Sequence, residues 1–333
     1  MKIIVDAMSG DNAPLEIIKG SALAVKELGI EILLVGDENI INKCIEENNI
    51  DNKAMTILHT DAPPIIMEDD AKAVLKEKAD SSMAVALKAL ADGLGDGMVS
   101  AGNTGALTVG TTFIVKRIKG IKRPAIASIM PTIAENPVLL MDCGANVECR
   151  SDVLNQFGLM GSVYMKKIMN IVNPRICLAN NGTEETKGTP VLQEAYQIMK
   201  NEKYNFCGNI EARQIPYGDC DVVVADGFTG NIILKMYEGV AAAIMKCVKG
   251  IFMKNLKSKL AALMLKDGIG ELKKQMDYKE YGGAVLLGAK QVVVKAHGSS
   301  DERSFKCAIR QAVKFADTGV IEEITKLASV TQE

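Results

Sequence analysis

Short hydrophobic runs alternate with stretches in which hydrophobic residues recur every three or four positions. Runs of this length are typical of buried strands, and the longer period is typical of amphipathic helices. The predicted strands span residues 3–5, 31–35, 55–58, 97–100, 125–130, 137–141, 175–179, 221–225 and 292–295. The predicted helices span residues 14–28, 38–47, 81–91, 104–115, 153–169, 191–200, 230–249 and 301–327.

This alternation predicts an α/β fold, because strand–helix–strand units give parallel strands with crossover helices on both faces. We expect a three-layer α/β/α arrangement around a mostly parallel sheet. No proline- or serine-rich linker interrupts residues 1–333, which favours a single domain. Residues 247–281 break the rhythm and are predicted to form an inserted amphipathic helical segment. The last helix is expected to start at a capping box formed by Ser299 and Glu302.

Glycine and small polar residues follow four of the predicted strands. Ligands bind beyond the carboxyl ends of strands in open α/β sheets, and we expect all four loops to face the same edge. The stretches are residues 6–11, 100–105, 142–146 and 226–231. The candidate binding residues in them are Asp6, Gly10, Asp11, Ser100, Gly102, Asn103, Thr104, Gly105, Asp142, Asn146, Asp226, Thr229 and Gly230.

Two of these loops share a Gly-x-Thr-Gly pattern between a strand and a helix. Glycine lets the backbone approach a ligand, and the first amides of a helix favour an anion such as phosphate. A single loop of this composition also occurs as an ordinary turn. The prediction of a binding site therefore rests on the presence of several such loops. Lys187, Arg123 and His297 lie near other predicted strand ends and could add charge or hydrogen bonds.

Motifs for other chemistries are missing or misplaced. The glycine-dense run at residues 93–97 precedes its strand, whereas a dinucleotide-binding fingerprint follows one. Neither an H-E-x-x-H zinc motif nor a G-x-S-x-G nucleophile elbow occurs, and no two of the eight cysteines show C-x-x-C spacing. We therefore expect no metal, and the sequence signal for a dinucleotide is weak. A site of amides and cations without a nucleophile suggests that the substrates, one of them phosphate, react directly with each other.

The overall composition limits which classes of binding partner the protein can have. A net charge of −2 provides no general attraction to nucleic acid, and 4% aromatic residues without tryptophan offer few stacking surfaces for bases. The N-terminus lacks the apolar core of a signal peptide, and no uncharged apolar run reaches the ~18 residues of a membrane span. We expect a cytoplasmic protein that attaches to a membrane at most peripherally.

The segment from residue 246 to 266 contains six lysines and no acidic residue before Asp267. Hydrophobic residues recur within it, so that a basic helix carries an apolar ridge, which suits an anionic membrane surface. An acidic protein partner, a dimer interface or packing on the core remain alternatives. The candidate docking residues are Phe252, Leu256, Leu260, Leu263, Met264, Lys254, Lys257 and Lys259.

Taken together and in order, the motifs resemble those of the bacterial phosphate acyltransferase (PlsX) family. The resemblance covers nearly the whole chain. It rests on residues 6–11 (DAMSGD), 66–82 (IMEDDAKAVLKEKADSS), 100–107 (SAGNTGAL), 123–125 (RPA), 142–146 (DCGAN), 182–188 (GTEETKG), 208–211 (GNIE), 221–235 (DVVVADGFTGNIILK), 278–288 (YKEYGGAVLLG) and 295–300 (KAHGSS).

The resemblance implies transfer of a fatty acyl group from acyl-carrier protein to inorganic phosphate, giving an acyl phosphate for phospholipid synthesis. It also implies an isocitrate-dehydrogenase- and phosphotransacetylase-like fold, in which residues 247–281 would form an inserted helical hairpin. It further implies a homodimer, no organic cofactor, peripheral membrane attachment and a membrane-bound glycerol-3-phosphate acyltransferase as the next enzyme. At matching positions, Lys187 and Asn231 become the catalytic candidates. Residues 103–105 and 229–230 become the cradle for phosphate and thioester.

Two other functions remain open from the residues alone. A nicotinamide-dependent dehydrogenase of the same architecture would need a metal-binding carboxylate cluster, for which Asp142 and Asp226 are the only candidates. A non-catalytic adaptor would use only the lysine-rich helices to bind a membrane or carrier protein.

Overall fold

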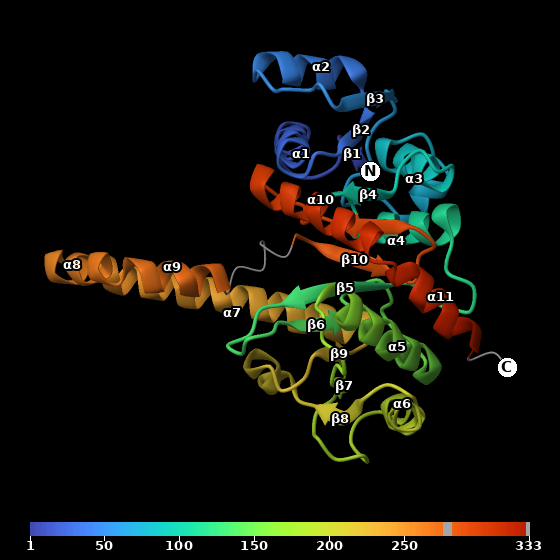
Figure 1. Ribbon diagram of the computed structural model, residues 1–333, viewed down its shortest axis with the longest axis vertical. Helices are drawn as coiled ribbons and strands as arrows, with labels where there is room; N and C mark the ends of the chain where they lie inside the picture. The colour runs from blue at the N-terminus through green and yellow to red at the C-terminus, as the bar shows by residue number, and fades with distance from the viewer. Residues whose placement is uncertain (276–281, 331–333) are drawn as a thin grey trace.

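A single sheet runs through the length of the protein, as the computed structural model shows for residues 1–275 and 282–330 (Figure 1). Its strand order is β3-β2-β1-β4-β11-β10-β5-β6-β9-β7-β8. The strands are β1 Lys2–Asp6, β2 Glu31–Gly36, β3 Met55–His59, β4 Gly97–Ser100, β5 Ala125–Met130, β6 Val138–Met141, β7 Ile176–Ala179, β8 Phe206–Ile210, β9 Val222–Val224, β10 Ala284–Leu287 and β11 Val292–Lys295.

Helices follow most of the strands and cover both faces of the sheet. They are α1 Leu15–Leu28, α2 Glu38–Glu47, α3 Ser82–Ala91, α4 Thr104–Gly110, α5 Ser151–Ile168, α6 Pro190–Lys200, α7 Gly227–Met253, α8 Leu256–Met264, α9 Lys266–Gln275, α10 Glu302–Asp317 and α11 Val320–Val330. Short turns of other helix types span Ala71–Leu75, Thr111–Val115 and Ala212–Tyr217.

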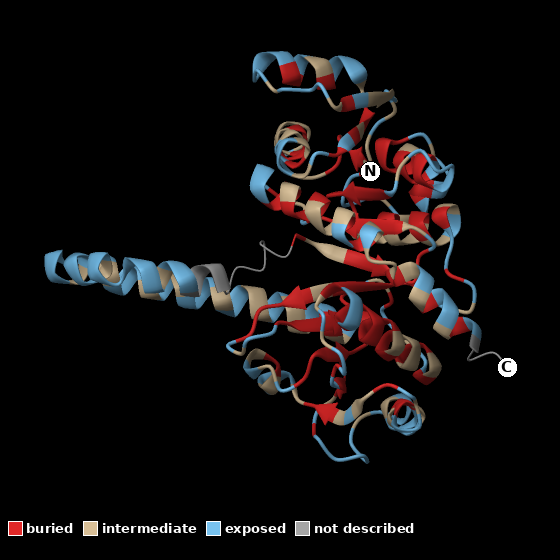
Figure 2. Ribbon diagram, viewed as in Figure 1, coloured by how far each residue is buried: buried red, intermediate tan, exposed pale blue. Residues whose placement is uncertain are grey.

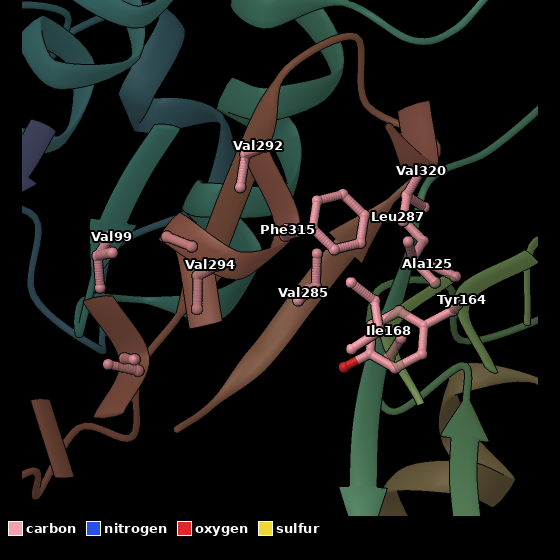
Figure 3. Close-up of a cluster of buried hydrophobic side chains, with 14 of the residues drawn as sticks. Val99, Ala125, Tyr164, Ile168, Val285, Leu287, Val292, Val294, Phe315 and Val320 are labelled. Carbon is pink, nitrogen blue, oxygen red and sulfur yellow. The ribbon is translucent and has the colours of Figure 1, made fainter. Parts of the chain in front are cut away.

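The sheet separates two hydrophobic cores. Successive strand side chains point to opposite faces, so Ile3 and Val5 of β1 join the core under α1, α5 and α10, whereas Ile4 joins the core under α3, α4 and α7. In the first core, the rings of Tyr164 and Phe315 lie 6.1 Å apart beside the valines of β10 and β11 (Figure 3). The predicted α/β/α layering is confirmed.

The strands change direction in the middle of the sheet. Strand β10 pairs antiparallel with both β11 and β5, and β5 pairs antiparallel with β6. Consequently β1, β4 and β11 run one way, whereas β6, β9 and β7 run the other. The prediction that all four glycine-containing loops share one edge was wrong, because hydrophobic runs reveal strands but not their directions.

Two strands escaped the sequence analysis. Strand β10 is an apolar run of only four residues after two glycines, and such a run does not distinguish strand from loop. Strand β8 contains Gly208 at a φ of +95° and the polar Asn209 in its five residues, which hides its strand pattern.

The C-terminal helix also differs from the prediction. It is divided into α10 and α11 at Gly319, whose φ of +66° ends the helical path. The cap of helix α10 lies two residues later than predicted: Asp301 caps it, accepting a 2.8 Å hydrogen bond from the amide of Ser304. The proposed Ser299–Glu302 box was therefore wrong. Ser299 instead lies 2.9 Å from the ring of His297.

A long helical arm projects from the body and is exposed over most of its surface (Figures 1 and 2). The sequence predicts a helical insertion over residues 247–281, and α8 and α9 lie within it. The arm also includes the outer part of α7, which continues unbroken to Met253 instead of ending at residue 249. Residues 276–281 of this prediction lie outside the described residues. No helix in the two described stretches is long and apolar enough to cross a bilayer.

Candidate functional site

A cavity of about 460 Å³ lies over the centre of the sheet, where the strand direction reverses. Ile126 and Ser128 of β5 and Ala284 of β10 line it from the sheet. Asn231, Lys235 and Glu238 of α7 line it from one half of the protein. The loops after β1, β4 and β11 line it from the other half. The cavity therefore joins strand ends that lie at opposite edges of the sheet.

Four of the predicted site residues line this cavity, namely Asp11, Thr104, Asn231 and His297. The sequence analysis missed several others, which are Met67, Ser128, Cys143, Lys235, Glu238, Lys295, Ser299, Ser300 and Ser304. Lys295 carried one usable signal, because it is a charged residue at the end of an otherwise apolar strand, Val292–Lys295. Five of the remaining residues lie within motifs that carry the family resemblance, which was a signal that could have marked them: Met67, Cys143, Lys235, Ser299 and Ser300.

Asp6 and Ser100 hold the first two loops together. The Asp6 carboxylate is completely buried and accepts hydrogen bonds of 2.6 Å from Ser82 and 2.7 Å from Ser100. The Ser100 oxygen in turn accepts one from the amide of Gly102, at 3.1 Å. Burial raises the pKa of Asp6, while these hydroxyl donors oppose the rise. Their contact with substrate stays a prediction, since their observed partners lie within the protein.

The loop after β4 is built for close packing. Asn103 caps α4 by accepting from the amide of Ala106 at 3.0 Å, and its own amide donates to the carbonyls of Ile66 and Met67, both at 3.1 Å. Side chains at Gly10 and Gly102 would collide with neighbouring atoms, as would one at Gly105 to a smaller degree. These contacts fix the position of Thr104 at the cavity wall.

Asp142 organises the loop after β6. Its carboxylate accepts from the amides of Ile126, Ala145 and Asn146 at 2.7–3.1 Å, and from the Asn146 side chain at 2.9 Å. Asn146 also donates to the carbonyl of Pro124 at 2.8 Å. Burial raises the pKa of Asp142, opposed by these donors. Both residues face inward, and their role in substrate binding stays a prediction.

The start of α7 is pressed against that same loop. Asp226 caps the helix by accepting from the amide of Thr229 at 2.7 Å, and the amide of Gly227 donates to the carbonyl of Asn146 at 2.7 Å. A side chain at Gly230 would fall on the carbonyl oxygen of Asp142. This close approach places Asn231 beside Gly144 at the cavity wall.

Lys187 and Arg123 lie away from the cavity lining. Both are exposed, Lys187 in the loop after β7 and Arg123 before β5. Strands β7 and β9 are parallel neighbours, so the Lys187 loop and the start of α7 with Asn231 leave the sheet at the same edge. The structure thus brings the two catalytic candidates to adjacent strand ends without placing Lys187 in the cavity wall.

Two lysines face the cavity in different states. Lys235 is exposed and forms a 2.8 Å ion pair with Glu238. Lys295 is only 9% exposed, and its ammonium donates to two backbone carbonyls, of Ala101 at 3.3 Å and of Ala296. Burial, reinforced by the charge of Lys235, lowers the pKa of Lys295 to about 8, while Asp11 and Asp6 oppose the shift.

Cys143 is the cavity's only thiol among residues 1–275 and 282–330. Burial, reinforced by the charge of Asp142, raises its pKa well above the usual value. Its sulfur lies 3.2 Å from the carbonyl of Leu140. A buried thiol in this state is a poor nucleophile, because the thiolate is the reactive form. In the same described stretches, no group of three or more His, Cys, Asp or Glu residues is placed to hold a metal ion.

Comparison with known proteins identifies the family. The family described as "Fatty acid synthesis protein" matches residues 1–323. A phosphate acyltransferase of Alkaliphilus oremlandii is 46% identical over 98% of this chain and 97% of its own length. A phosphate acyltransferase of Clostridioides difficile is 42% identical over 100% of this chain and 98% of its own length. The chain belongs to the phosphate acyltransferase family. This confirms the resemblance drawn from the ordered motifs.

Solved structures support the same fold for this phosphate acyltransferase family member. A phosphotransacetylase from Streptococcus pyogenes superposes with a TM-score of 0.65 at 19% identity, covering 95% of this chain and 94% of its own. A branched-chain phosphotransacylase from Enterococcus faecalis superposes with a TM-score of 0.58 at 16% identity, covering 96% of this chain and 99% of its own. At such identities the likeness establishes the architecture, and it confirms the phosphotransacetylase-like fold that the sequence predicts.

The close contact between Gly230 and the Asp142 carbonyl can be tested by comparing two glycine substitutions on helix α7. Gly230→Ala is expected to lower the free energy of unfolding by about 1–3 kcal/mol, because the added methyl overpacks against the Asp142 carbonyl. Gly239→Ala, on the same α7, meets nothing within 4 Å and is expected to raise it by up to about 1 kcal/mol through helix propensity. Urea unfolding of both variants measures the difference. Equal effects at the two positions would contradict the contact.

Proposed function

We propose that this member of the phosphate acyltransferase family transfers a fatty acyl group from acyl-carrier protein to inorganic phosphate, giving an acyl phosphate. The observation that carries the proposal is family membership over nearly the whole chain, combined with a cavity lined by cations and amide groups. The relatives named above are phosphate acyltransferases. These findings favour acyl transfer over the dehydrogenase and adaptor alternatives.

The proposed reaction is direct. A phosphate oxygen attacks the thioester carbonyl carbon, the new C–O bond forms, and the C–S bond then breaks to release the carrier thiol. The proton of the attacking hydrogen phosphate balances the thiolate that leaves. A thiol is a good leaving group, and the protonated Cys143 supports transfer without a covalent enzyme intermediate.

Asn231 and Lys187 are proposed to stabilise the charge that develops in this step. The Asn231 amide at the cavity wall is suited to donate to the carbonyl oxygen of the thioester. Lys187, from the adjacent strand end, is proposed to close over the bound substrates and to balance the negative charge of the phosphate or the oxyanion. The exposed position of its loop leaves room for that movement.

These roles are tested by an assay with an acyl-carrier thioester, with and without phosphate, and with hydroxylamine to trap the acyl phosphate. The native protein is expected to consume thioester only when phosphate is present. Asn231→Ala and Lys187→Ala are expected to lower kcat by about 100-fold or more, the effect of removing an oxyanion donor.

The exposed Lys203 supplies a matched control, and Lys203→Ala is expected to retain native activity. Full activity in both the Asn231 and Lys187 variants would reject the assigned roles. Stable thioester in both conditions would reject the reaction itself.

The tip of the arm is proposed to bind an anionic membrane surface. Leu256, Leu260 and Leu263 are 63–84% exposed, and Met264 is 82% exposed. The predicted docking lysines Lys254, Lys257 and Lys259 are exposed around them, whereas Phe252 is half-buried. Apolar insertion combined with lysine attraction is how amphipathic helices bind anionic lipid. Peripheral attachment would deliver acyl phosphate to a membrane-bound glycerol-3-phosphate acyltransferase.

Flotation with vesicles containing anionic phosphatidylglycerol tests this surface. The double variant Leu256→Glu, Leu260→Glu is expected to lose vesicle binding while keeping transferase activity, since it removes apolar side chains proposed to insert into the bilayer and adds charge that anionic lipid repels. The control Val172→Glu changes an equally exposed apolar residue (87%) on the body and is expected to bind normally. Native binding by the double variant would exclude the tip as the membrane contact.

The inner part of α7 is proposed to pair with a second copy of the chain in a homodimer. Phe228, Ile232, Met236, Val240 and Ile244 recur every four residues and are 46–67% exposed. Lysines on this helix become dense only from Lys246 onward. An exposed apolar stripe beside which the one lysine, Lys235, is paired with Glu238 suits a protein surface better than an anionic membrane.

Sedimentation measures this pairing. The native chain is expected to sediment as a dimer, and Ile244→Glu is expected to shift it toward the monomer, because a charge is placed inside the apolar contact. Val172→Glu again serves as the control on the body. An unchanged dimer in the Ile244 variant would place the interface elsewhere.

A further inference from the structure

Lys295 is unusual among the charged groups at the cavity. Its side chain is buried, and no ion pair of Lys295 is found within residues 1–275 and 282–330. Two of its three N–H donors have backbone carbonyls as partners, and the third remains for a ligand. A buried charge without an oppositely charged partner is unfavourable. It therefore indicates that an anion is bound in the working state.

The position of Lys295 relates it to the predicted phosphate loop. Strands β11 and β4 are parallel neighbours, and Lys295 aligns with Ser100 at their carboxyl ends. Its ammonium contacts the carbonyl of Ala101, three residues before Thr104, which also lines the cavity. The buried ammonium of Lys295 therefore contacts the loop that the sequence predicts to bind phosphate.

We propose that Lys295 binds the phosphate substrate, so that its ammonium holds one oxygen of the dianion while another oxygen attacks the thioester. This inference rests on the proposed function of the site. Lys235 is a weaker candidate for the same role, because Glu238 already neutralises it. In this assignment Lys295 fixes the nucleophile from the β11 side, and Asn231 approaches the acyl group from the α7 side.

The charges around Lys295 set its pH dependence. Asp6 ends β1 and Asp11 lies in the loop after it, Lys235 and Glu238 lie on α7, and His297 follows β11. Because burial lowers the pKa of Lys295 to about 8, the ammonium is present below that pH and is lost as the pH rises through it. Phosphate binding to the free enzyme is therefore expected to weaken above about pH 8.

Steady-state kinetics of Lys295→Gln tests the assignment. Loss of a charged hydrogen bond is expected to raise the KM for phosphate by about 10- to 100-fold, with the KM for the acyl-carrier thioester little changed. The fall in kcat/KM for phosphate above pH 8 is expected to disappear. Lys290→Gln, at an exposed lysine just before β11, is the matched control and is expected to behave as the native enzyme.

Two further variants test the charge itself. Lys295→Arg keeps a cation at high pH and is expected to shift the alkaline fall upward. Lys235→Gln removes a neighbouring positive charge and is expected to raise the pH at which kcat/KM for phosphate falls. Calorimetric titration with inorganic phosphate alone, without acyl donor, gives a readout independent of turnover, and the Gln variant is expected to bind at least tenfold more weakly.

The outcomes separate the two proposals. Native phosphate affinity in Lys295→Gln, or an alkaline fall that none of these variants moves, would overturn the role of Lys295 while leaving acyl transfer intact. A native enzyme that binds phosphate through Lys295 but never consumes thioester would overturn the proposed reaction alone. Circular dichroism establishes that each variant is folded before its affinity is compared.

Discussion

The reversal of strand direction at the centre of the sheet determines where this protein can bind a ligand. Because β10 and β5 separate two sets of strands that run in opposite directions, the loops after β1 and β4 and those after β6 and β9 leave opposite edges. Strand β10 is four residues long, which spans only about 13 Å. Side chains from both edges therefore meet over the sheet face, and the cavity forms there.

The polar residues around the cavity divide into supports and ligand candidates. Asp6 and Asp142 are buried, but each accepts several internal hydrogen bonds, and these bonds hold the loops in place. Asn231 and Lys295 retain donors that are not all used inside the protein. The close contact of Gly230 with the Asp142 carbonyl connects the supporting loop to a ligand candidate, because it sets the position of the first turn of α7 and thereby of Asn231.

The arm carries the two surfaces proposed for membrane binding and for dimerisation, and both lie outside the cavity lining. Its tip combines exposed leucines with lysines, whereas the inner stripe of α7 is apolar and bordered by few charges. Because α7 is one continuous helix from Gly227 to Met253, Asn231 and the apolar stripe proposed for dimerisation lie on the same helix, whereas the tip residues lie on α8.

The sequence by itself determined most elements, the α/β class and the family, because hydrophobic periodicity and ordered glycine motifs are local properties. It also marked Asn231, Thr104, Asp11 and His297, which do line the cavity. Only the tertiary structure decided that Asp142 faces inward, that Lys187 lies outside the cavity wall and that Lys295 is buried within it. The physical reason is that strand direction and burial depend on contacts between residues far apart in the chain, and such contacts leave no local pattern.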